Sequence, residues 1–260
     1  MWSRFVALGD SFTEGLMDDV GPDGRHRGWA DRTAVALAEL NPDLEYANLA
    51  IRGRLMPQVM TEQVPAALAL QPDLVSIAAG VNDTLRRSYD LDASMTSLEG
   101  GVRELRASGA DVLLFAFGDP SRRSAIMGSV RDRIARANAA THAIADHYGC
   151  IVVDFWGRAV FDDDALWDSD RLHLSPAGHA VASAAALETL GVGDDQWRTP
   201  LPPSPVPSST RRALGHARWA KDHFGPWVVR RLQGRSSGDD IVPKQATLAR
   251  VRDAGPPSLT

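Results

Sequence analysis

Short apolar runs alternate with longer segments of helical period along the chain as far as Leu190. This alternation is typical of parallel βαβ units, in which a buried strand is followed by a helix that covers the sheet. The runs predict five strands, at Phe5–Leu8, Leu44–Leu49, Leu74–Ala79, Val112–Phe117 and Ile151–Asp154. We therefore expect an α/β fold built on a parallel sheet of five strands.

Apolar or small residues recur at helical spacing in Trp29–Leu40, Leu98–Ala107 and Val130–His147. A further helix is expected from about Pro176 to Leu190, because Ser175 can cap its free amides and proline suits the first helical position. Helices flanking a sheet of five strands make a three-layer α/β/α sandwich.

The pattern changes after Leu190. Residues 201–209 are too rich in proline and serine to form a regular element and are typical of an extended linker. We therefore predict a main domain over residues 1–193, a Pro/Ser-rich linker over 194–209 and a basic, aromatic helical extension over 210–260. The last 15 or so residues have the composition of a poorly ordered terminus.

The extension has helical patterns at Thr210–Phe224 and Trp227–Leu232, separated by a Gly-Pro break. Its aromatic residues Trp219, Phe224 and Trp227 are costly to leave in water. We expect the extension to pack on the main domain or on a second copy of the chain, which would make a homo-oligomer. Over the strand ends it would help to shape a ligand pocket.

Composition places the chain among ordinary globular proteins, with 44% hydrophobic and 23% charged residues in 260. It holds no apolar run of about 18 residues that could cross a bilayer. A removable signal peptide would have to precede the first predicted strand, which begins at Phe5 and is soon followed by Ser11, and the chain leaves no room for it. We therefore expect a cytoplasmic protein. The one cysteine, Cys150, fits a reducing compartment and precedes an apolar run, where it is expected to pack as a small hydrophobe.

Charge is unevenly distributed. Residues 211–260 hold ten basic and four acidic residues, a net charge of +6, whereas the remainder holds 18 basic and 29 acidic residues, a net charge of −11. An acidic body with a basic tail favours docking of the tail on the body; the alternative is an anionic partner such as a phosphate. We expect no nucleic-acid partner.

The candidate chemistry begins with Ser11, which follows an apolar run in Gly-Asp-Ser, and with Asp170 and His173, which precede a helical segment. A serine hydroxyl attacks a carbonyl only when an imidazole takes its proton and a carboxylate orients that imidazole. Gly53 and Asn82 each follow a strand-like segment and offer a backbone amide and a side-chain amide to a developing oxyanion.

Each fragment also has a plain structural interpretation. Gly-Asp-Ser is commonly a turn, Asn82 a helix cap, Gly53 a loop hinge, and Asp170 with His173 a surface pair. Four such fragments in one order favour the catalytic interpretation.

In this order the fragments resemble the sequence blocks of the SGNH (GDSL-like) hydrolases, of the bacterial intracellular type, over about residues 4 to 190. The resemblance implies a flavodoxin-like strand order, a nucleophile at Ser11, an Asp170–His173 pair, and oxyanion donors at Ser11, Gly53 and Asn82. Ser11 is followed by a phenylalanine where the family name leads one to expect a leucine, and the position stays apolar. Ligand sites of open parallel sheets lie outside the carboxyl ends of the strands, where Ser11, Gly53 and Asn82 fall.

Three functions follow from these residues. The first is a serine esterase that acts on a small acylated substrate through an acyl-Ser11 intermediate. The second is an acyltransferase that uses the same triad to move an acyl group from acyl-CoA to a sugar hydroxyl. The third is a binding module that keeps the fold without turnover, which the complete set of catalytic residues disfavours.

Other charged residues have weaker signals. Arg52 and Arg54 flank Gly53 and are expected either to be solvated or to meet an anionic or sugar-like group, and His179 is a candidate substrate contact. Asp162–Asp164 has no neighbouring histidine and no calcium-loop spacing, so we expect a solvated bend and no metal. No nucleotide-binding fingerprint occurs, and we expect no cofactor.

Overall fold

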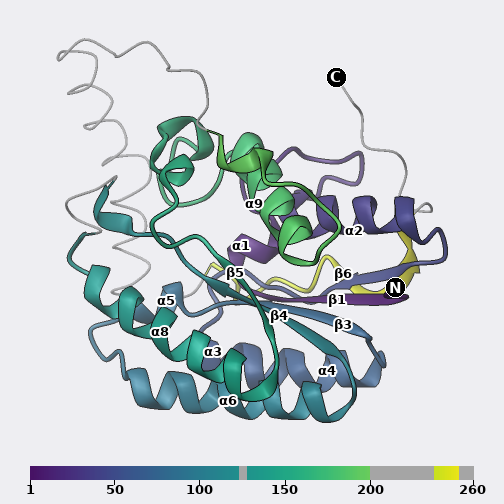
Figure 1. Cartoon of the computed structure of the whole chain (residues 1–260), viewed down its shortest axis with the longest axis horizontal. Coiled ribbons are helices and arrows are strands. Elements are labelled where there is room, and N and C mark those ends of the chain that lie inside the picture. The colour runs from purple at the N-terminus through teal and green to yellow at the C-terminus, as the bar shows by residue number, and fades with distance from the viewer. Residues whose placement is uncertain (123–127, 200–236, 252–260) are drawn as a thin grey trace.

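Six strands form one sheet in the computed structural model, which describes residues 1–122, 128–199 and 237–251 (Figure 1). The strands are β1 Arg4–Gly9, β2 Glu45–Asn48, β3 Leu74–Ala78, β4 Asp111–Ala116, β5 Ile151–Asp154 and β6 Gln245–Arg250. Their order across the sheet is β5-β4-β3-β1-β2-β6. The first five are parallel in the flavodoxin-like order, as the resemblance implied, and no predicted end is wrong by more than one residue.

The central strands are apolar on both faces because helices cover both. In β1, Phe5 and Ala7 belong to the core on one face, and Val6 and Leu8 to the core on the other; all four are fully buried. A strand covered on both sides needs apolar residues at successive positions rather than alternate ones. This is why the strands were readable as continuous apolar runs.

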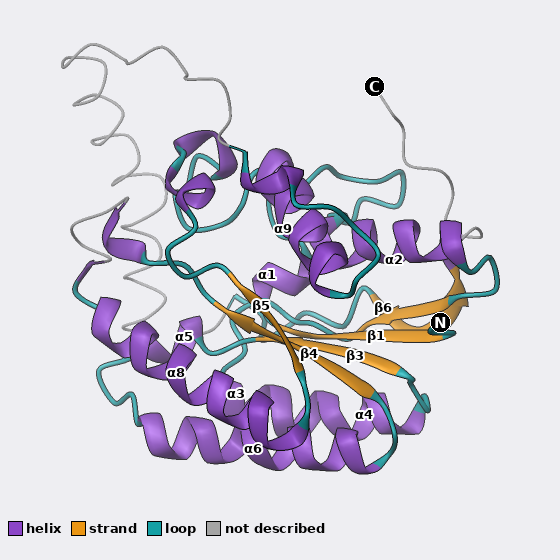
Figure 2. Ribbon diagram, viewed as in Figure 1, coloured by secondary structure: helices purple, strands orange, loops and turns teal. Residues whose placement is uncertain are grey.

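Helices pack on both faces of the sheet and complete the three layers (Figure 2). One face carries α2, Gly28–Leu40, and α9, Pro176–Thr189, which also pack against each other. The other carries α6, Leu91–Ala107, and α8, Arg131–Tyr148, together with the short α4, Val64–Ala69. The three-layer α/β/α prediction is confirmed.

Local capping sets where two of these helices begin. α9 begins as predicted, with the Ser175 hydroxyl accepting the Gly178 amide and Pro176 at the first position. α6 begins at Leu91, seven residues before its predicted start, because Asp90 caps it by accepting the Ala93 amide at 3.0 Å. The apolar pattern alone did not reveal that cap.

The segment between β2 and β3 was not predicted. It contains α3, Met56–Gln58, a π-helical turn, Val59–Gln63, and then α4. A π-turn shifts the helical period by one residue, so no single periodicity runs through the segment.

The C-terminal strand corrects the expectation for the chain's end. Residues predicted to be helical or poorly ordered include β6, which pairs antiparallel with the free edge of β2. Most of its side chains are exposed and only Leu248 packs on the core, so its apolar pattern is weak. Part of the predicted linker also packs, since Gln196–Arg198 forms a 3₁₀ turn with Trp197 buried. The predicted helices at Thr210–Phe224 and Trp227–Leu232 lie outside the described residues.

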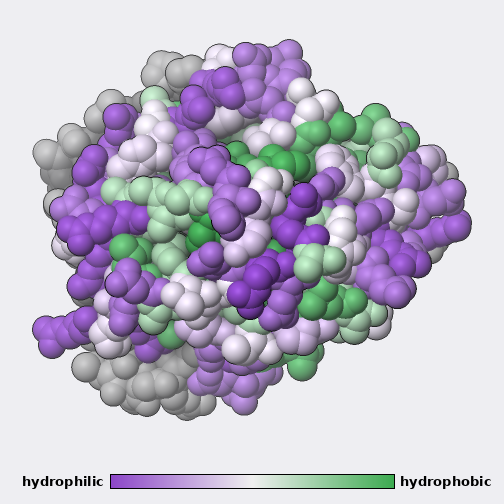
Figure 3. Space-filling view, turned by 60° about the horizontal axis from the view of Figure 1, so that its bottom comes forward, coloured by the Kyte–Doolittle hydropathy of each residue, from purple (hydrophilic) through white to green (hydrophobic). Residues whose placement is uncertain are grey.

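The surface shows no single apolar face in the view of Figure 3, where hydrophobic residues occur in separate groups among hydrophilic ones. Among the described residues, no helix is both long and apolar enough to cross a bilayer. Cys150 is half-buried against the core, and burial raises the pKa of its thiol, which disfavours the nucleophilic thiolate.

Candidate active site

Ser11 lies where the chain leaves β1 and begins the single turn α1, Ser11–Glu14. Gly9, just before this turn, has φ of +148°, and a Cβ there would lie 2.3 Å from the Ala78 carbonyl oxygen of β3. Only glycine allows the backbones to approach so closely. Asp10 then caps α1 by accepting the Phe12 amide at 3.1 Å.

His173 faces Ser11 from the loop before α9, more than 160 positions later in the chain. Its Nε2 lies 3.0 Å from the Ser11 Oγ, and its Nδ1 lies 2.5 Å from the Asp170 Oδ2. Because Nδ1–H donates to the carboxylate, Nε2 is left to accept the serine proton. This is the geometry of a nucleophile, a general base and an orienting carboxylate.

The Asp170 carboxylate is held in place by its own loop. It also accepts the backbone amides of Leu172 and His173, both at 2.9 Å. Burial opposes its ionisation, but the hydrogen bonds from the His173 ring and from these amides outweigh burial and lower the pKa of Asp170. Asp170 therefore stays ionised beside the imidazole at neutral pH.

Asp10 is buried next to the nucleophile and does not contact the far side of His173. Burial raises its pKa to about 7, against the opposing effect of the hydrogen bond from the Phe12 amide. Its Oδ2 accepts the Asn82 side-chain amide at 3.0 Å, and the same Asn82 nitrogen donates to the Arg54 carbonyl at 3.2 Å. Asp10 thus organises the turn and also fixes Asn82 beside the loop that holds Gly53.

A cavity of about 140 Å³ opens beside Ser11 and His173. Its walls are mainly apolar and include five aromatic side chains that follow the parallel strands or come from the loop before α9: Phe12, Phe117, Phe155, Phe161 and Trp167. Phe12 is central to this cluster, with ring centroids 5.6 to 6.3 Å from four aromatic neighbours and from His179. The cavity next to the nucleophile is therefore apolar.

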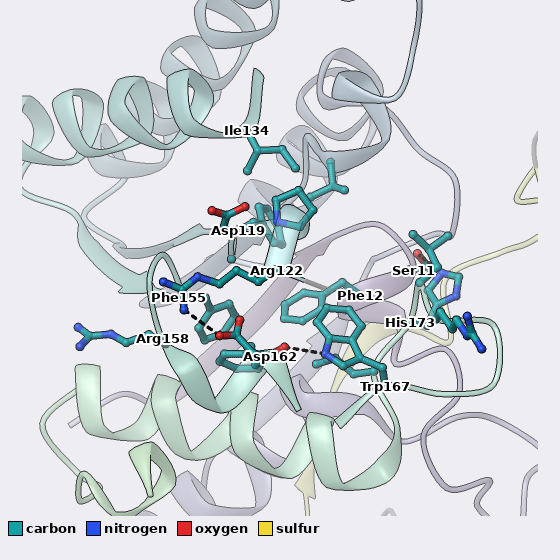
Figure 4. Close-up of a pocket in the computed structure, with 18 of the residues that line it drawn as sticks. Ser11, Phe12, Asp119, Arg122, Ile134, Phe155, Arg158, Asp162, Trp167 and His173 are labelled. Atoms are coloured by element: carbon teal, nitrogen blue, oxygen red, sulfur yellow. Dashed lines mark hydrogen bonds and ion pairs between the residues drawn. The ribbon is translucent and has the colours of Figure 1, made fainter. Parts of the chain in front are cut away.

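The end of the cavity away from Ser11 carries charged groups (Figure 4). Arg122 and Asp162 form an ion pair of 2.8 Å there, with Arg158 and Asp119 also in the lining. Figure 4 shows Ser11 and His173 at one side, Phe12 and Trp167 between, and the Arg122–Asp162 pair at the other.

His179 lines the same cavity, but its ring nitrogens are taken by backbone groups. Its Nδ1 accepts the Trp29 amide at 3.2 Å, and its Nε2 donates to the Leu16 carbonyl at 3.1 Å. Burial lowers the pKa of His179 to about 4, so the ring is neutral at pH 7. Contact with a substrate, as predicted for His179, stays a prediction, and only ring carbons are left for it.

Gly53 lies in the loop after β2 with φ of +76°, a conformation that favours glycine. Its flanking arginines turn to carboxylates rather than to the cavity. Arg52 pairs with Glu14 of α1, and Arg54 lies 3.0 Å from Glu62. Neither arginine lines the cavity, so substrate contact by Arg52 or Arg54 stays a prediction with no support from this geometry.

The model of the GDSL-like lipase/acylhydrolase family matches residues 7–181, a range that includes Ser11, Asp170 and His173. The chain belongs to this family. As a GDSL-like hydrolase it is an enzyme of the SGNH esterase type, and the family resemblance seen in the sequence is confirmed. No curated protein matches its sequence.

Solved structures agree with the fold of this GDSL-like hydrolase. Axe2, an acetylxylan esterase from Geobacillus stearothermophilus, is 20% identical with a TM-score of 0.60, over 75% of this chain and 95% of Axe2. TesA is 24% identical with a TM-score of 0.59, over 72% of this chain and 98% of TesA. LAE5, an enzyme from the metagenome of Lake Arreo in Spain, is 22% identical with a TM-score of 0.62, over 74% of this chain and 97% of LAE5.

One residue beside the site of this GDSL-like hydrolase, Gln63, was not predicted from the sequence. Gln63, buried at the end of the π-turn, donates to the Gly9 carbonyl at 2.9 Å and accepts the Gly9 amide at 2.8 Å. It holds the residue that leads into the Asp10–Ser11 turn. A lone glutamine in an unpredicted segment gives no local signal for this role, and a π-turn is the kind of irregularity that often marks functional sites.

The described residues contain no group of His, Cys, Asp or Glu arranged to hold a metal ion. In the acidic run, Asp162 pairs with Arg122 and Asp163 caps the 3₁₀ turn Asp164–Leu166 by accepting the Ala165 amide.

Proposed function

We propose that this enzyme is a serine-dependent acyl-ester hydrolase that works through an acyl-Ser11 intermediate. One observation carries the proposal: the Ser11 Oγ, the His173 ring and the Asp170 carboxylate form a continuous hydrogen-bonded chain at the wall of an apolar cavity. A triad is recognised by such geometry and by the roles it allows rather than by its order in the sequence.

The chemistry follows from the tautomer of His173. Nε2 takes the Ser11 proton while Oγ forms a bond to the acyl carbon, and Asp170 stabilises the resulting imidazolium. His173 then gives that proton to the departing alcohol as its bond to the acyl carbon breaks, which leaves acyl-Ser11. Water repeats the steps in reverse, forms the carboxylic acid and restores the Ser11 hydroxyl.

The oxyanion would be held by the amides of Ser11 and Gly53 and by the Asn82 side chain. Asn82 is supported in this role by its position, since it contacts both Asp10 and the carbonyl next to Gly53. Both N–H groups of its side-chain amide already donate, one to the Asp10 carboxylate and one to the Arg54 carbonyl. An oxyanion would therefore share one of these N–H groups with the oxygen that already accepts it. Loss of one such donor costs about 10²–10³ in rate in comparable sites.

The cavity supports an apolar, short acyl group. Its volume of about 140 Å³ is small beside the roughly 300–1,000 Å³ of drug-sized sites. The acyl chain would lie among Phe12, Phe155 and Trp167. A longer apolar chain would reach the charged end near Arg122, where it would remove water from charged groups at a cost in free energy.

The test is a series of p-nitrophenyl esters from acetyl to decanoyl, with wild type, Ser11→Ala and Arg250→Met. Arg250 is an exposed residue of β6 paired with Asp43 and serves as the control. We expect turnover of the short esters by wild type and Arg250→Met and none by Ser11→Ala. Equal turnover by Ser11→Ala would contradict the proposal.

Addition of sugar acceptors separates hydrolysis from the acyltransferase alternative, because the same triad serves both. A hydrolase releases acid at a rate that ignores the acceptor. Turnover that is slow in water, rises with the acceptor and yields an acylated sugar would assign the enzyme to the transferases.

A further inference from the structure

Lys244, just before β6, inserts its side chain into the main domain. Its ammonium donates to the backbone carbonyls of Glu14 at 2.7 Å, His26 at 2.9 Å and Arg27 at 2.6 Å, and it forms an ion pair with the Asp31 carboxylate. The side chain is only 10% exposed. An ammonium with this many oxygen partners is fixed in place rather than solvated.

The acceptors belong to the framework of the nucleophile. Glu14 is the last residue of α1, the turn that begins with Ser11, and Arg27 directly precedes α2. The two backbones are already close there, since a Cβ on Gly15 would lie 2.4 Å from the Cα of Gly28. Lys244 therefore joins the end of α1 to the start of α2.

The same C-terminal segment contacts the loop of the predicted oxyanion donor. A Cβ on Gly238 would lie 2.0 Å from the Arg52 carbonyl oxygen, so the backbones touch one residue before Gly53. On the other side, the Glu14 carboxylate accepts the Arg52 amide at 2.7 Å and pairs with its guanidinium. Arg52 is thus held between α1 and the C-terminal segment.

We propose that Lys244 is a positioning residue: it fixes the end of the nucleophile turn α1 against the start of α2, and the C-terminal segment that carries it also packs on the Gly53 loop through Gly238. The inference rests on the proposed function of Ser11 and Gly53. β6 has its own hydrogen bonds to β2 and does not need a buried ammonium for pairing. A buried ion pair is by itself weak evidence for stability, so Lys244 is better explained by the geometry it imposes.

The first variant is Lys244→Met, with Arg250→Met as the matched control from the same segment. The measurements are kcat and KM for p-nitrophenyl butyrate, the rate constant of inactivation by a fluorophosphonate, and the thermal unfolding midpoint. Because a small misplacement of reacting groups can cost up to about 10²-fold in rate, we expect Lys244→Met to lower kcat and the inactivation constant by about 10- to 100-fold. KM should change little, and Arg250→Met should match wild type.

A second variant, Asp31→Asn with Lys244→Met, separates positioning from stability. Burial raises the pKa of Asp31 to about 6 even though the Lys244 ammonium opposes this. Lys244→Met removes that ammonium and leaves the Tyr46 hydroxyl as a neutral partner, so a charge on Asp31 becomes more costly. Replacing Asp31 by asparagine removes that charge. We expect the double variant to regain thermal stability relative to Lys244→Met. Its kcat should stay low, because the carbonyls of Glu14, His26 and Arg27 still lack the ammonium that joins them.

Recovery of kcat together with stability, a wild-type kcat in Lys244→Met, or failure of the double variant to fold would each overturn the inference. These outcomes are distinct from failure of the proposed function. An active Ser11→Ala overturns the triad, whereas an inactive Ser11→Ala with a fully active Lys244→Met overturns the positioning role alone.

Discussion

His179 connects the active site to the acid stability of the enzyme. Its neutral ring bridges the Leu16 carbonyl after the nucleophile turn and the Trp29 amide of α2. The Nδ1 atom accepts a hydrogen bond from the Trp29 backbone amide, so protonating Nδ1 destroys that hydrogen bond. The side chain is 1% exposed, and the imidazolium would gain little hydration in exchange. Lowering the pH should therefore act directly on this bridge.

The size of the effect follows from the pKa. A shift from 6.5 to about 4, at about 1.4 kcal/mol for each pKa unit, corresponds to about 3 kcal/mol. Because the unfolded state binds the proton more readily, this stabilisation is fully present above pH 6.5 and is lost as the pH falls through the folded pKa. About 2.5 kcal/mol should be lost by about pH 4.5.

The assay is urea unfolding of wild type and of His179→Gln at about pH 7.5 and about pH 4.5. Every other titrating group is shared, so the difference between their changes in unfolding free energy isolates His179. Wild type should lose about 2 to 3 kcal/mol more than the variant on acidification. Equal losses in the two proteins would refute the assignment of a buried, neutral His179.

Asp170→Asn keeps the shape of the carboxylate but no longer favours the correct tautomer of His173, so kcat should fall by about 10³–10⁴ in steady-state assays, and a change below tenfold would exclude Asp170 as the orienting group. Asn82→Ala should lower kcat by about 10²–10³ with a smaller effect on KM, and an unchanged kcat would remove Asn82 from the oxyanion site. Gln63→Leu leaves the Gly9 amide without its buried acceptor and should lower the free energy of unfolding by about 1–3 kcal/mol; an unaltered urea midpoint would show that the clamp is dispensable.

The sequence could predict the sheet and the catalytic candidates because both are written in local patterns. β1 is apolar at successive positions, as a strand covered by helices on both faces requires. The start of α9 is recognisable from its N-cap residue, Ser175. Ser11 and Asn82 each follow a parallel strand, and because the carboxyl ends of such strands meet at one edge of the sheet, the sequence alone predicted that they lie close together. The order of residues along the chain is enough for inferences of this kind.

Features that depend on partners far away in the sequence could not be predicted from local patterns. β6 carries little periodicity of its own, because an edge strand gains its hydrogen bonds from β2 rather than from its side chains. Gln63 is recognisable only beside Gly9, and Lys244 only beside Glu14. The charge asymmetry pointed to a tail on the body but gave no contact.

The sequence by itself determined the five parallel strands, the long helices that flank them and the residue types of the candidate site, since periodicity and functional groups are properties of short segments. Only the tertiary structure decided the 3.0 Å approach of His173 to Ser11, the pairing of Arg52 and Arg54 with carboxylates, and the burial of the Lys244 ammonium. Distances, burial and the pKa values that follow from them arise where segments far apart in the chain exclude water from one another, and no local pattern encodes that.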